Sequence, residues 1–224
     1  MTKERRILVI GDLHAPFIRE GYLEFCKKVY KEQKCNMVVC TGDVIDSHAA
    51  SYHEADPDGM SAGDELSAAI EALQPWKKAF PKMKICIGNH DRMAMRKAFS
   101  AGVSKRWVKD YNDVLGCPKW EFEHKFIIDN VCYVHGEGQN LKSKMASNRM
   151  SYVGGHRHSE LYVVHSVSDH DCLFAMQIGW GGEQESYAVN YARDLKRGVV
   201  SCGVVLKDGT MPIPIPMPLK NKVK

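Results

Sequence analysis

Acidic, amide and imidazole side chains follow apolar runs at several points in this sequence, and each group stands beside a glycine. In the stretch KICIGNHD, an apolar run ends in Gly88, Asn89, His90 and Asp91. A glycine lets the backbone turn sharply where a strand ends, so the polar side chains around it can approach a common point. Amide and carboxylate oxygens and imidazole nitrogens can bind a metal ion, and imidazoles and carboxylates can also transfer a proton. The grouping therefore indicates a chemical site at the ends of strands.

Four similar groups stand elsewhere in the chain. Their members are Asp12 and His14 in GDLH, Asp43 and Asp46 in GDVID, His135 in YVHGEG, and His156 and His158 in GGHRH. Residues i and i+2 of an extended segment point the same way, so each D-x-H or H-x-H pair can face one pocket. One such pair arises by chance in many proteins. Five groups in order, each after a β-like run, indicate one shared site.

The candidate metal ligands offer nitrogen and oxygen atoms and no sulfur. Two Asp, one Asn and four His suit Mn²⁺, Fe, Zn²⁺, Ni²⁺ or Co²⁺, and differ from the cysteine ligands of structural zinc. Seven ligands are too many for one tetrahedral ion but suit two ions that share a bridging carboxylate. Enzymes use that arrangement for in-line displacement at phosphorus. We expect two divalent ions, and Mn²⁺ first, because the set is rich in oxygen for zinc.

The elements that must position these residues alternate in the first half of the chain. Strands are predicted over 5–12, 36–43 and 82–91, and helices over 21–34 and 61–80. Continuous apolar runs joined by helices indicate a parallel sheet, and ligands bind beyond the carboxyl ends of such strands. Ser61 is the predicted N-cap of the second helix, with Asp64 at the capping-box position.

The second half is predicted to be rich in strands and poor in helix. The predicted strand regions are 119–136, which turns at Asp129 and Asn130, and then 150–158, 161–168, 171–180 and 198–209. They indicate a mixed or antiparallel sheet packed against the first. The tail 211–224 has proline at every second position from 212 to 218, which excludes a central strand. We expect it to be an edge strand followed by a basic terminus.

The motifs D-x-H, G-D-x-x-D, G-N-H-D, a later H and G-H-x-H, in this order over residues 12–158, resemble the calcineurin-like metallophosphoesterase superfamily. The stretch 42–76 further resembles small members that bacteriophages encode. The resemblance implies one metallophosphoesterase domain over residues 1–224. Its fold would be α/β, a four-layer α/β/β/α sandwich of two packed mixed sheets flanked by helices.

The resemblance also implies a role for each motif residue. The metal ligands would be Asp12, His14 and His158 for one ion, Asn89, His135 and His156 for the other, and Asp43 as the bridge between them. His90 would meet the leaving-group oxygen, Asp46 would orient His90 with its carboxylate, and Asp91 would brace the turn or a ligand imidazole. The implied reaction is phosphoester hydrolysis by a hydroxide that bridges the metals, without a covalent enzyme intermediate.

Two motif positions bear on the substrate. Protein Ser/Thr phosphatases of this superfamily read G-D-x-x-D-R-G and G-N-H-E, whereas this chain reads GDVIDSH and GNHD, so Ser47 replaces the arginine that grips phosphate. The G-N-H-D form is closer to the phosphodiesterase and nuclease-like branches. We therefore expect a phosphodiesterase of nucleotides or nucleic acid, with phosphomonoesters as further substrates. A Ser/Thr-type protein phosphatase is the alternative, and an inactive metal-binding scaffold is disfavoured because no ligand is missing.

Candidate substrate contacts stand near the motifs. They are His48, His53, Arg92 and Arg157. The basic and aromatic segment 104–120 is predicted to be an amphipathic, solvated helix. If the substrate is nucleic acid, Lys105, Arg106 and Lys109 in this segment would be the first phosphate contacts to test.

Composition limits the class of protein. The chain has 224 residues, of which 44% are hydrophobic and 26% charged, as is ordinary for a soluble globular protein. Its net charge of +4 is too small to identify a nucleic-acid binder. The start lacks the long apolar region of a signal peptide, and the eight cysteines form no C-x-x-C pair. We expect a cytoplasmic protein, in a host cell if a phage encodes it, with no membrane contact and no obligate protein partner.

Overall fold

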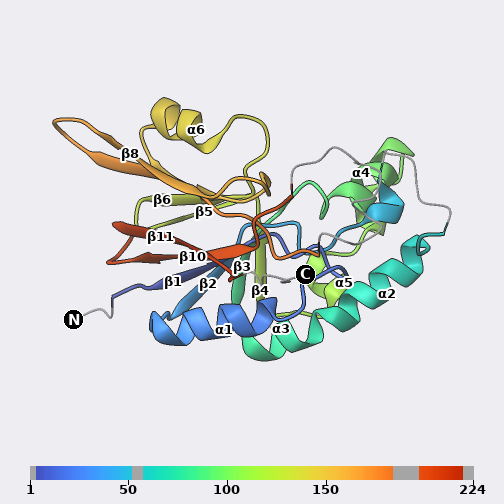
Figure 1. The fold of residues 1–224 in the computed structure, drawn as a ribbon. Coiled ribbons are helices and arrows are strands. Elements are labelled where there is room, and N and C mark those ends of the chain that lie inside the picture. The colour runs from blue at the N-terminus through green and yellow to red at the C-terminus, as the bar shows by residue number, and fades with distance from the viewer. Residues whose placement is uncertain (1–3, 52–57, 184–196, 219–224) are drawn as a thin grey trace.

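The structure is a computed structural model that describes residues 4–51, 58–183 and 197–218. Within these residues the strands form a sheet of six and a sheet of five, which pack face to face (Figure 1). The strands of the first sheet, in spatial order, are β11 (Met211–Pro216), β10 (Ser201–Leu206), β1 (Ile7–Ile10), β2 (Met37–Cys40), β3 (Met83–Cys86) and β4 (Trp120–Glu123). Those of the second are β5 (Lys125–Ile128), β6 (Val131–Val134), β7 (Ser151–Gly154), β9 (Cys172–Gln177) and β8 (Tyr162–Val167).

Both sheets are mixed. Strands β1 to β4 run parallel to one another, and β10 and β11 run antiparallel beside β1. In the second sheet β6, β7 and β9 are parallel, and β5 and β8 pair antiparallel at its two edges. Parallel neighbours carry their carboxyl ends to the same edge of a sheet, which is the edge where ligands bind in open α/β folds.

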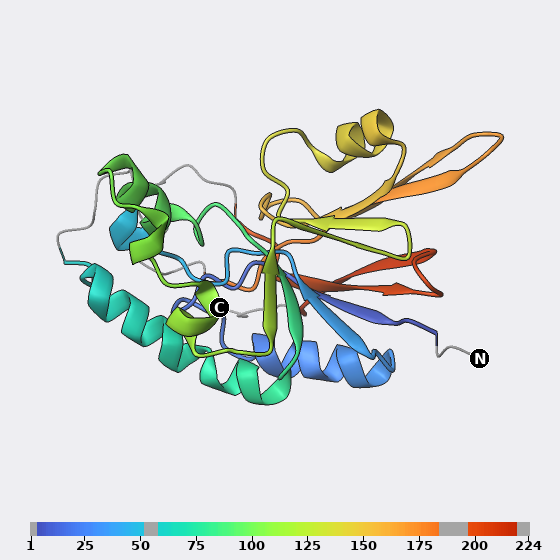
Figure 2. The same cartoon turned by 180° about the vertical axis from the view of Figure 1, so that it is seen from behind.

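Helices cover both outer faces of the paired sheets. The α-helices are α1 (Tyr22–Glu32), α2 (Ala62–Ala72), α3 (Gln74–Ala79), α4 (Met93–Ser100), α5 (Tyr111–Leu115) and α6 (Leu141–Asn148), and the 3₁₀ turns are η1 (His48–Ala50) and η2 (Lys105–Trp107). Helices α1, α2 and α3 lie along the first sheet and α6 lies on the second (Figures 1 and 2). The predicted four-layer α/β/β/α arrangement is confirmed.

Side chains that alternate along each strand divide between separate apolar layers. In β1, Leu8 and Ile10 pack toward the helices, whereas Ile7 and Val9 pack between the two sheets. A third apolar cluster joins the second sheet to α6. Burying each such side chain contributes about 1.5–3 kcal/mol, so the strands are held in register from both faces.

The predicted helix over 61–80 is two helices. Ser61 caps α2 as expected, since its Oγ accepts from the Asp64 N–H at 3.2 Å and donates to Asp64 Oδ2 at 2.7 Å. The helix is interrupted at Leu73, just before Pro75. A proline has no N–H to continue the hydrogen-bond ladder but is tolerated in the first turn of a new helix, where α3 places it.

The predicted amphipathic helix over 104–120 is wrong. This segment holds η2, the short helix α5 and the start of β4. Gly116, with φ of 61°, ends α5 in the left-handed conformation that only glycine adopts easily, and Pro118 follows. The 119–136 region also differs from expectation: Asp129 and Asn130 do turn between β5 and β6, but β4 pairs with β3 in the other sheet.

Strand β11 is an edge strand, as predicted for the start of the tail, and it pairs with β10 alone. Its prolines at 212, 214 and 216 occupy every second position, opposite Val205, Gly203 and Ser201. The intervening Ile213 and Ile215 pack against the core beneath the helices. Among the residues described, every helix is too short or too polar to cross a lipid bilayer.

Candidate metal centre

The polar motif residues all lie in loops that follow parallel strands. Asp12 and His14 follow β1, Asp43 and Asp46 follow β2, Asn89, His90 and Asp91 follow β3, His135 follows β6, and His156 and His158 follow β7. The loops meet where the two sheets adjoin: the His135 carbonyl accepts from Gly155 N–H at 2.9 Å, and Asp12 Oδ2 accepts from His156 N–H at 2.7 Å. Each sheet therefore provides the residues of one side of the site.

Asp12, His14 and His158 form the first cluster, and their ligand atoms lie within 4.8 Å of one another. His158 Nε2 is 3.2 Å from Asp12 Oδ2 and 3.3 Å from His14 Nε2. Asp12 is fully buried and His14 is 4% exposed. This is the set predicted to hold one metal ion.

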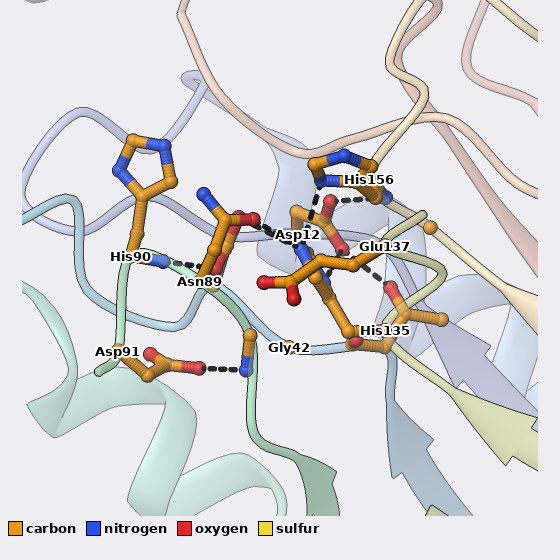
Figure 3. Close-up of polar contacts among 12 residues, drawn as sticks. Asp12, Gly42, Asn89, His90, Asp91, His135, Glu137 and His156 are labelled. Atoms are coloured by element: carbon orange, nitrogen blue, oxygen red, sulfur yellow. Dashed lines mark hydrogen bonds and ion pairs between the residues drawn. The ribbon is translucent and has the colours of Figure 1, made fainter. Parts of the chain in front are cut away.

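Asp43, His135 and His156 form the second cluster, also within 4.8 Å. His135 Nε2 lies 3.1 Å from Asp43 Oδ2, 3.1 Å from His156 Nδ1 and 2.8 Å from Asn89 Oδ1. Figure 3 shows Asn89, His135 and His156 turned toward Asp12. Asp43 Oδ2 is also 3.8 Å from His14 Nε2, so this carboxylate lies between the two clusters.

Hydrogen bonds on the far side of two imidazoles fix which ring nitrogen faces the site. His135 Nδ1 donates to the Thr41 carbonyl at 3.1 Å, and His14 Nδ1 donates to Asp46 Oδ1 at 2.6 Å. In the neutral rings both Nε2 atoms then carry lone pairs. Those lone pairs face carboxylate oxygens and other imidazole nitrogens, which are also hydrogen-bond acceptors. Acceptors this close repel one another unless a cation, either a proton or a metal ion, lies between them. Nitrogen and oxygen donors of this kind fit divalent transition metals.

In the metal-free protein, protons supply that positive charge. Burial disfavours the imidazolium of His135, but the Asp43 and Asp12 carboxylates outweigh it and raise the pKa of His135 to about 10. Burial opposes the charge on His14 as well, yet the hydrogen bond to Asp46 raises its pKa to about 9. Burial alone would raise the pKa of Asp43, but His135 holds it well below its usual range. A metal ion that binds here must displace protons from His14 and His135.

The sequence model of the calcineurin-like phosphoesterase family matches residues 5–192. This chain belongs to that family. The match includes every motif residue of both clusters, and their candidate nitrogen and oxygen ligands have the chemistry such an enzyme requires. The chain is a metal-dependent phosphoesterase.

Solved structures of other proteins are similar to this chain at low sequence identity. Vacuolar protein sorting 29 from Cryptosporidium parvum matches with a TM-score of 0.54 and 15% identity over 98% of this chain and 94% of that one. Yfce, a phosphoesterase from E. coli, matches with a TM-score of 0.44 and 11% identity, over 89% of this chain and 87% of that one. The Pseudomonas putida nuclease MPE matches with a TM-score of 0.40 and 14% identity, over 93% of this chain and 87% of that one. No match was found among the curated proteins. The likeness to small bacteriophage members stays a prediction.

In this calcineurin-like phosphoesterase His90 and Asp46 lie beside the clusters, but their contact differs from the expected one. The Asp46 carboxylate binds His14, and it is the Asp46 carbonyl that accepts from His90 Nδ1, at 2.5 Å. Asp46 Oδ1 is 3.7 Å from His90 Nδ1. Asp46 therefore orients His90 through its main-chain carbonyl. It orients His14, a candidate metal ligand, through its carboxylate. The His90 ring is partly exposed and stands to one side of the cluster (Figure 3).

Asp91 joins the loops that follow β2 and β3. Its Oδ1 accepts from the N–H of Val44 at 2.9 Å and of Ile45 at 3.3 Å, and its Oδ2 accepts from Gly88 N–H at 2.9 Å (Figure 3). Burial and the charge of Asp43 raise the pKa of Asp91 to about 6. The carboxylate thus braces the turn of the G-N-H-D motif.

The candidate substrate contacts have varied surroundings. Arg92 pairs with Glu137, at 2.6 Å from Oε2, and donates from Nε to the Gly88 carbonyl at 3.1 Å. Arg157 is partly exposed, with Nη2 3.3 Å from the Gly138 carbonyl. His48 is buried in η1, and His53 lies outside the described residues.

A polar cavity of about 230 Å³ opens beside the second cluster. It is lined by Ile87, Arg92, His124, Val134, His135, Gly136, Glu137 and Lys144. Burial lowers the pKa of Lys144, whose ammonium donates to the Glu137 carbonyl at 2.8 Å. The cavity is therefore lined by two cationic side chains, Arg92 and Lys144, together with the Glu137 carboxylate and the His135 imidazole.

Several residues that support the candidate ligands were not predicted from the sequence. Thr41 donates from Oγ1 to Asp12 Oδ1 at 2.6 Å while its carbonyl holds His135. Trp180 stacks on His158, with ring centroids 4.7 Å apart and 15° between the planes. Thr41 directly precedes a motif and could have been suspected for that reason. Trp180 lies 22 positions beyond His158 and carries no such signal.

Two motif glycines are required for space, which differs from the expected role in turning. A Cβ atom on Gly88 would lie 2.0 Å from Asp43 Oδ1, and one on Gly155 would lie 2.3 Å from Asp12 Oδ1. Any side chain at either position would push a candidate ligand out of place. Gly42, with φ of 117°, does fill the predicted turning role.

Proposed function

We propose that this phosphoesterase hydrolyses phosphodiesters of nucleotides or nucleic acid and needs two divalent ions, most suitably Mn²⁺. The observation that carries the proposal is the pair of largely buried clusters of candidate ligands with Asp43 between them. If only one cluster held an ion, the oxygen and nitrogen lone pairs of the other cluster would face and repel one another. Two ions 3.5–4 Å apart, as a general estimate, act together on phosphoesters in many hydrolases.

Asp12, His14 and His158 would hold one ion, Asn89, His135 and His156 the other, and Asp43 would contact both. When bound, such ions provide a water-derived nucleophile at neutral pH and balance negative charge on phosphoryl oxygens. The chain supports this chemistry by fixing its imidazoles: Thr41 and Asp46 hold the outer ring nitrogens of His135 and His14, and Trp180 holds the plane of His158.

His90 would assist departure of the leaving group. Its Nδ1 proton is engaged by the Asp46 carbonyl, so Nε2 is the atom available to substrate. When both ring nitrogens carry protons, Nε2–H can hydrogen-bond the leaving oxygen and transfer its proton as the bond to phosphorus breaks. A positioned general acid of this kind contributes about 10²–10⁴-fold to rate.

The preference for diesters rests on how the nearby cations are placed. Ser47 stands where the protein phosphatases have a phosphate-gripping arginine, and Arg92 is already neutralised by Glu137. A phosphomonoester carries up to two negative charges and gains most from such an arginine. A diester carries one charge and needs it less. This favours the diester over the alternative, a Ser/Thr-type protein phosphatase.

The test is turnover of bis-(p-nitrophenyl) phosphate beside p-nitrophenyl phosphate, on metal-stripped protein with Mn²⁺ added back. We expect the higher kcat/KM on the diester and none without metal. A higher kcat/KM on the monoester would support the phosphatase alternative. Absence of turnover on both compounds with Mn²⁺, Fe²⁺, Zn²⁺, Ni²⁺ and Co²⁺ would overturn the proposal.

Asp43→Asn is the variant that tests the shared ligand, because an amide is a poor bridge between two cations. We expect it to lose metal-dependent turnover and to bind less metal by elemental analysis. Asp113→Asn, an exposed aspartate in α5, removes the same charge and serves as the control. Full activity with normal metal content in Asp43→Asn would remove the bridging assignment.

A further inference from the structure

The segment 92–109, which directly follows the G-N-H-D motif, carries six cations and no acid. The cations are Arg92, Arg96, Lys97, Lys105, Arg106 and Lys109. The chain as a whole has a net charge of only +4, from 31 basic and 27 acidic residues. Glu137 neutralises Arg92, but the other five cations still concentrate positive charge in this segment. Acidic residues resume at Asp110.

The same segment exposes large apolar side chains. Trp107 is 85% exposed, Phe99 44% and Val103 40%. Lys105, Arg106 and Lys109 flank Trp107 in sequence and are exposed as well. We call residues 92–109 the basic-aromatic segment. A single exposed indole is ordinary by itself. One that is flanked by three exposed cations suits an anionic partner with flat rings on which it can stack.

The segment begins beside the proposed leaving-group histidine. The N–H of Met93, the first residue of α4, donates to the His90 carbonyl at 3.1 Å. In Figures 1 and 2, α4 lies at the end of the molecule to which β1, β2 and β3 direct their carboxyl ends. A chain bound along this segment would therefore lead toward the metal centre.

We propose that the basic-aromatic segment binds single-stranded nucleic acid and guides it to the metal centre, an inference that rests on the proposed phosphodiesterase function. Lys105, Arg106 and Lys109 would contact backbone phosphates, and Trp107 would stack on a base. Cations that follow a phosphate backbone, together with aromatic rings that accept any base, are the usual means of binding single strands without sequence preference.

A membrane surface is the competing occupant, since tryptophan and lysine also bind anionic lipid. The nucleic acid is favoured because its phosphodiester is the group that the adjoining metal centre is proposed to cleave. Stacking also suits a single protruding indole, whereas stable lipid binding needs an extended apolar face. The three exposed apolar residues are interspersed with cations in this segment.

The experiment measures binding of a short fluorescein-labelled single-stranded DNA by anisotropy, at a series of KCl concentrations. Metal-stripped protein is used so that the strand is not cleaved. For Lys105→Gln/Arg106→Gln we expect weaker binding and a slope of log K against log salt that is smaller by about 1.4, since each lost phosphate contact accounts for about 0.7. For Trp107→Ala we expect binding at least about fivefold weaker with the slope unchanged, because stacking releases no counterions.

The matched control is Lys78→Gln/Lys82→Gln, which removes the same charge from exposed positions in α3 and just before β3. We expect this control to retain both the affinity and the salt slope. Equal losses in the control and in Lys105→Gln/Arg106→Gln would show a non-specific charge effect and overturn the inference. Binding to phosphatidylserine vesicles through Trp107, with no binding to DNA, would also overturn it and identify a membrane contact instead.

Turnover of bis-(p-nitrophenyl) phosphate separates this inference from the function on which it rests. That compound is too small to reach along the segment, so we expect all three variants to hydrolyse it like the unaltered protein. If the unaltered protein hydrolyses it but the Trp107 and Lys105/Arg106 variants bind DNA as well as the control, the segment has no such role. If the unaltered protein does not hydrolyse it, the proposed function fails by itself.

Discussion

Gly155 illustrates how a single methyl group could remove metal binding. A Cβ there would lie 2.3 Å from Asp12 Oδ1 and 2.5 Å from Thr41 Oγ1, closer than such atoms approach. We expect Gly155→Ala to displace Asp12 and lower metal affinity by about 10–100-fold, as changes next to a ligand commonly do. Isothermal titration with Mn²⁺ measures the effect. Gly63→Ala in α2, where the nearest atom is 4.0 Å away, is the control, and equal affinities in the two variants would contradict this account.

His90→Gln separates catalysis from metal binding. The proposed role of His90 is to donate a proton, and it lies outside the two proposed ligand sets, so we expect metal content to stay normal while kcat falls by about 10²–10⁴-fold. A lower metal content would instead make His90, which lies close to His14 and Asp46, a ligand. The loss should be greater for an alkyl than for a p-nitrophenyl leaving group, because the alkoxide needs its proton more. Steady-state kinetics on both esters tests this. A loss independent of the leaving group would remove the role of His90 as acid.

At the scale of residues, the sequence indicated the candidate ligands far better than the residues that hold them. Asp12, Asp43 and His135 stand out because each follows a strand and has a side chain of a kind that binds metal, and the fold brings the three together. Trp180 and Thr41 act through packing and hydrogen bonds that only the folded chain creates. The Asp46 carboxylate, predicted to orient His90, lies 2.6 Å from His14 Nδ1 and 3.7 Å from His90 Nδ1, because two histidines are within its reach and sequence spacing cannot distinguish them.

Among the elements, η1 depends on one buried carboxylate. Glu65 of α2 accepts from the N–H groups of His48 and Ala49, both at 2.8 Å, and is 3% exposed. Glu65→Ala leaves two donors without this acceptor, so we expect a loss of about 2 kcal/mol in the free energy of unfolding. Urea unfolding measures it. Glu71→Ala, exposed on the same helix, should stay within about 0.5 kcal/mol. A Glu65 variant as stable as that control would show that other groups hold η1.

The helices and strands were predicted correctly where burial spaces apolar residues regularly along the sequence. They were predicted wrongly where residues such as glycine and proline interrupt that spacing. The strands of the first half alternate between two apolar layers, and their pattern is visible in the sequence. In 104–120 the apolar residues are spaced as in a helix, but the backbone is extended at Val108 and Asp110, between η2 and α5, and Gly116 ends α5. Helices α4 and α6 were not predicted. α6 is short and packs mainly through Leu141 and Met145, too few apolar positions to show a period.

For the whole molecule, the proposed metal centre would link the two sheets. Asp12, Asp43 and Asn89 belong to loops of the first sheet, and His135 and His156 to loops of the second. A bound ion would therefore stabilise the packing of one sheet on the other. Ligand at about 1,000 times its Kd adds about 4.1 kcal/mol for one site, which for a protein of this size raises Tm by roughly 8–16 °C.

This stabilisation should depend on pH with a definite sign. The pKa values of His14 and His135 are raised to about 9 and about 10 from 6.5. Their contribution to the metal-free fold is complete below pH about 6.5 and is lost as pH rises through the folded values. A metal ion competes with those protons, so its affinity rises over the same range. We expect the Tm difference between metal-loaded and metal-free protein to widen from pH 6.5 to 9, by differential scanning calorimetry. A difference that narrows would contradict the assignment of these ligands.

The fold as a whole was predicted through the resemblance of the motifs to a superfamily, and the family match and the architecture agree with it. Local pattern alone predicted a parallel sheet and a second sheet against it. It did not predict that the chain passes from β4 in one sheet to β5 in the other across His124 alone. Such a crossing depends on which strands find each other in space, and no local pattern encodes it.

The alternate prolines of β11 have a consequence for how copies of this chain meet. An edge strand normally offers N–H groups to which a strand of another molecule can add, and this is how sheets grow into aggregates. Since Pro212, Pro214 and Pro216 stand at every second position while β11 stays paired with β10, the donors they lack are those that would face outward. This side of the six-stranded sheet is therefore closed to extension, and concentrated protein is protected there against edge-to-edge polymerisation.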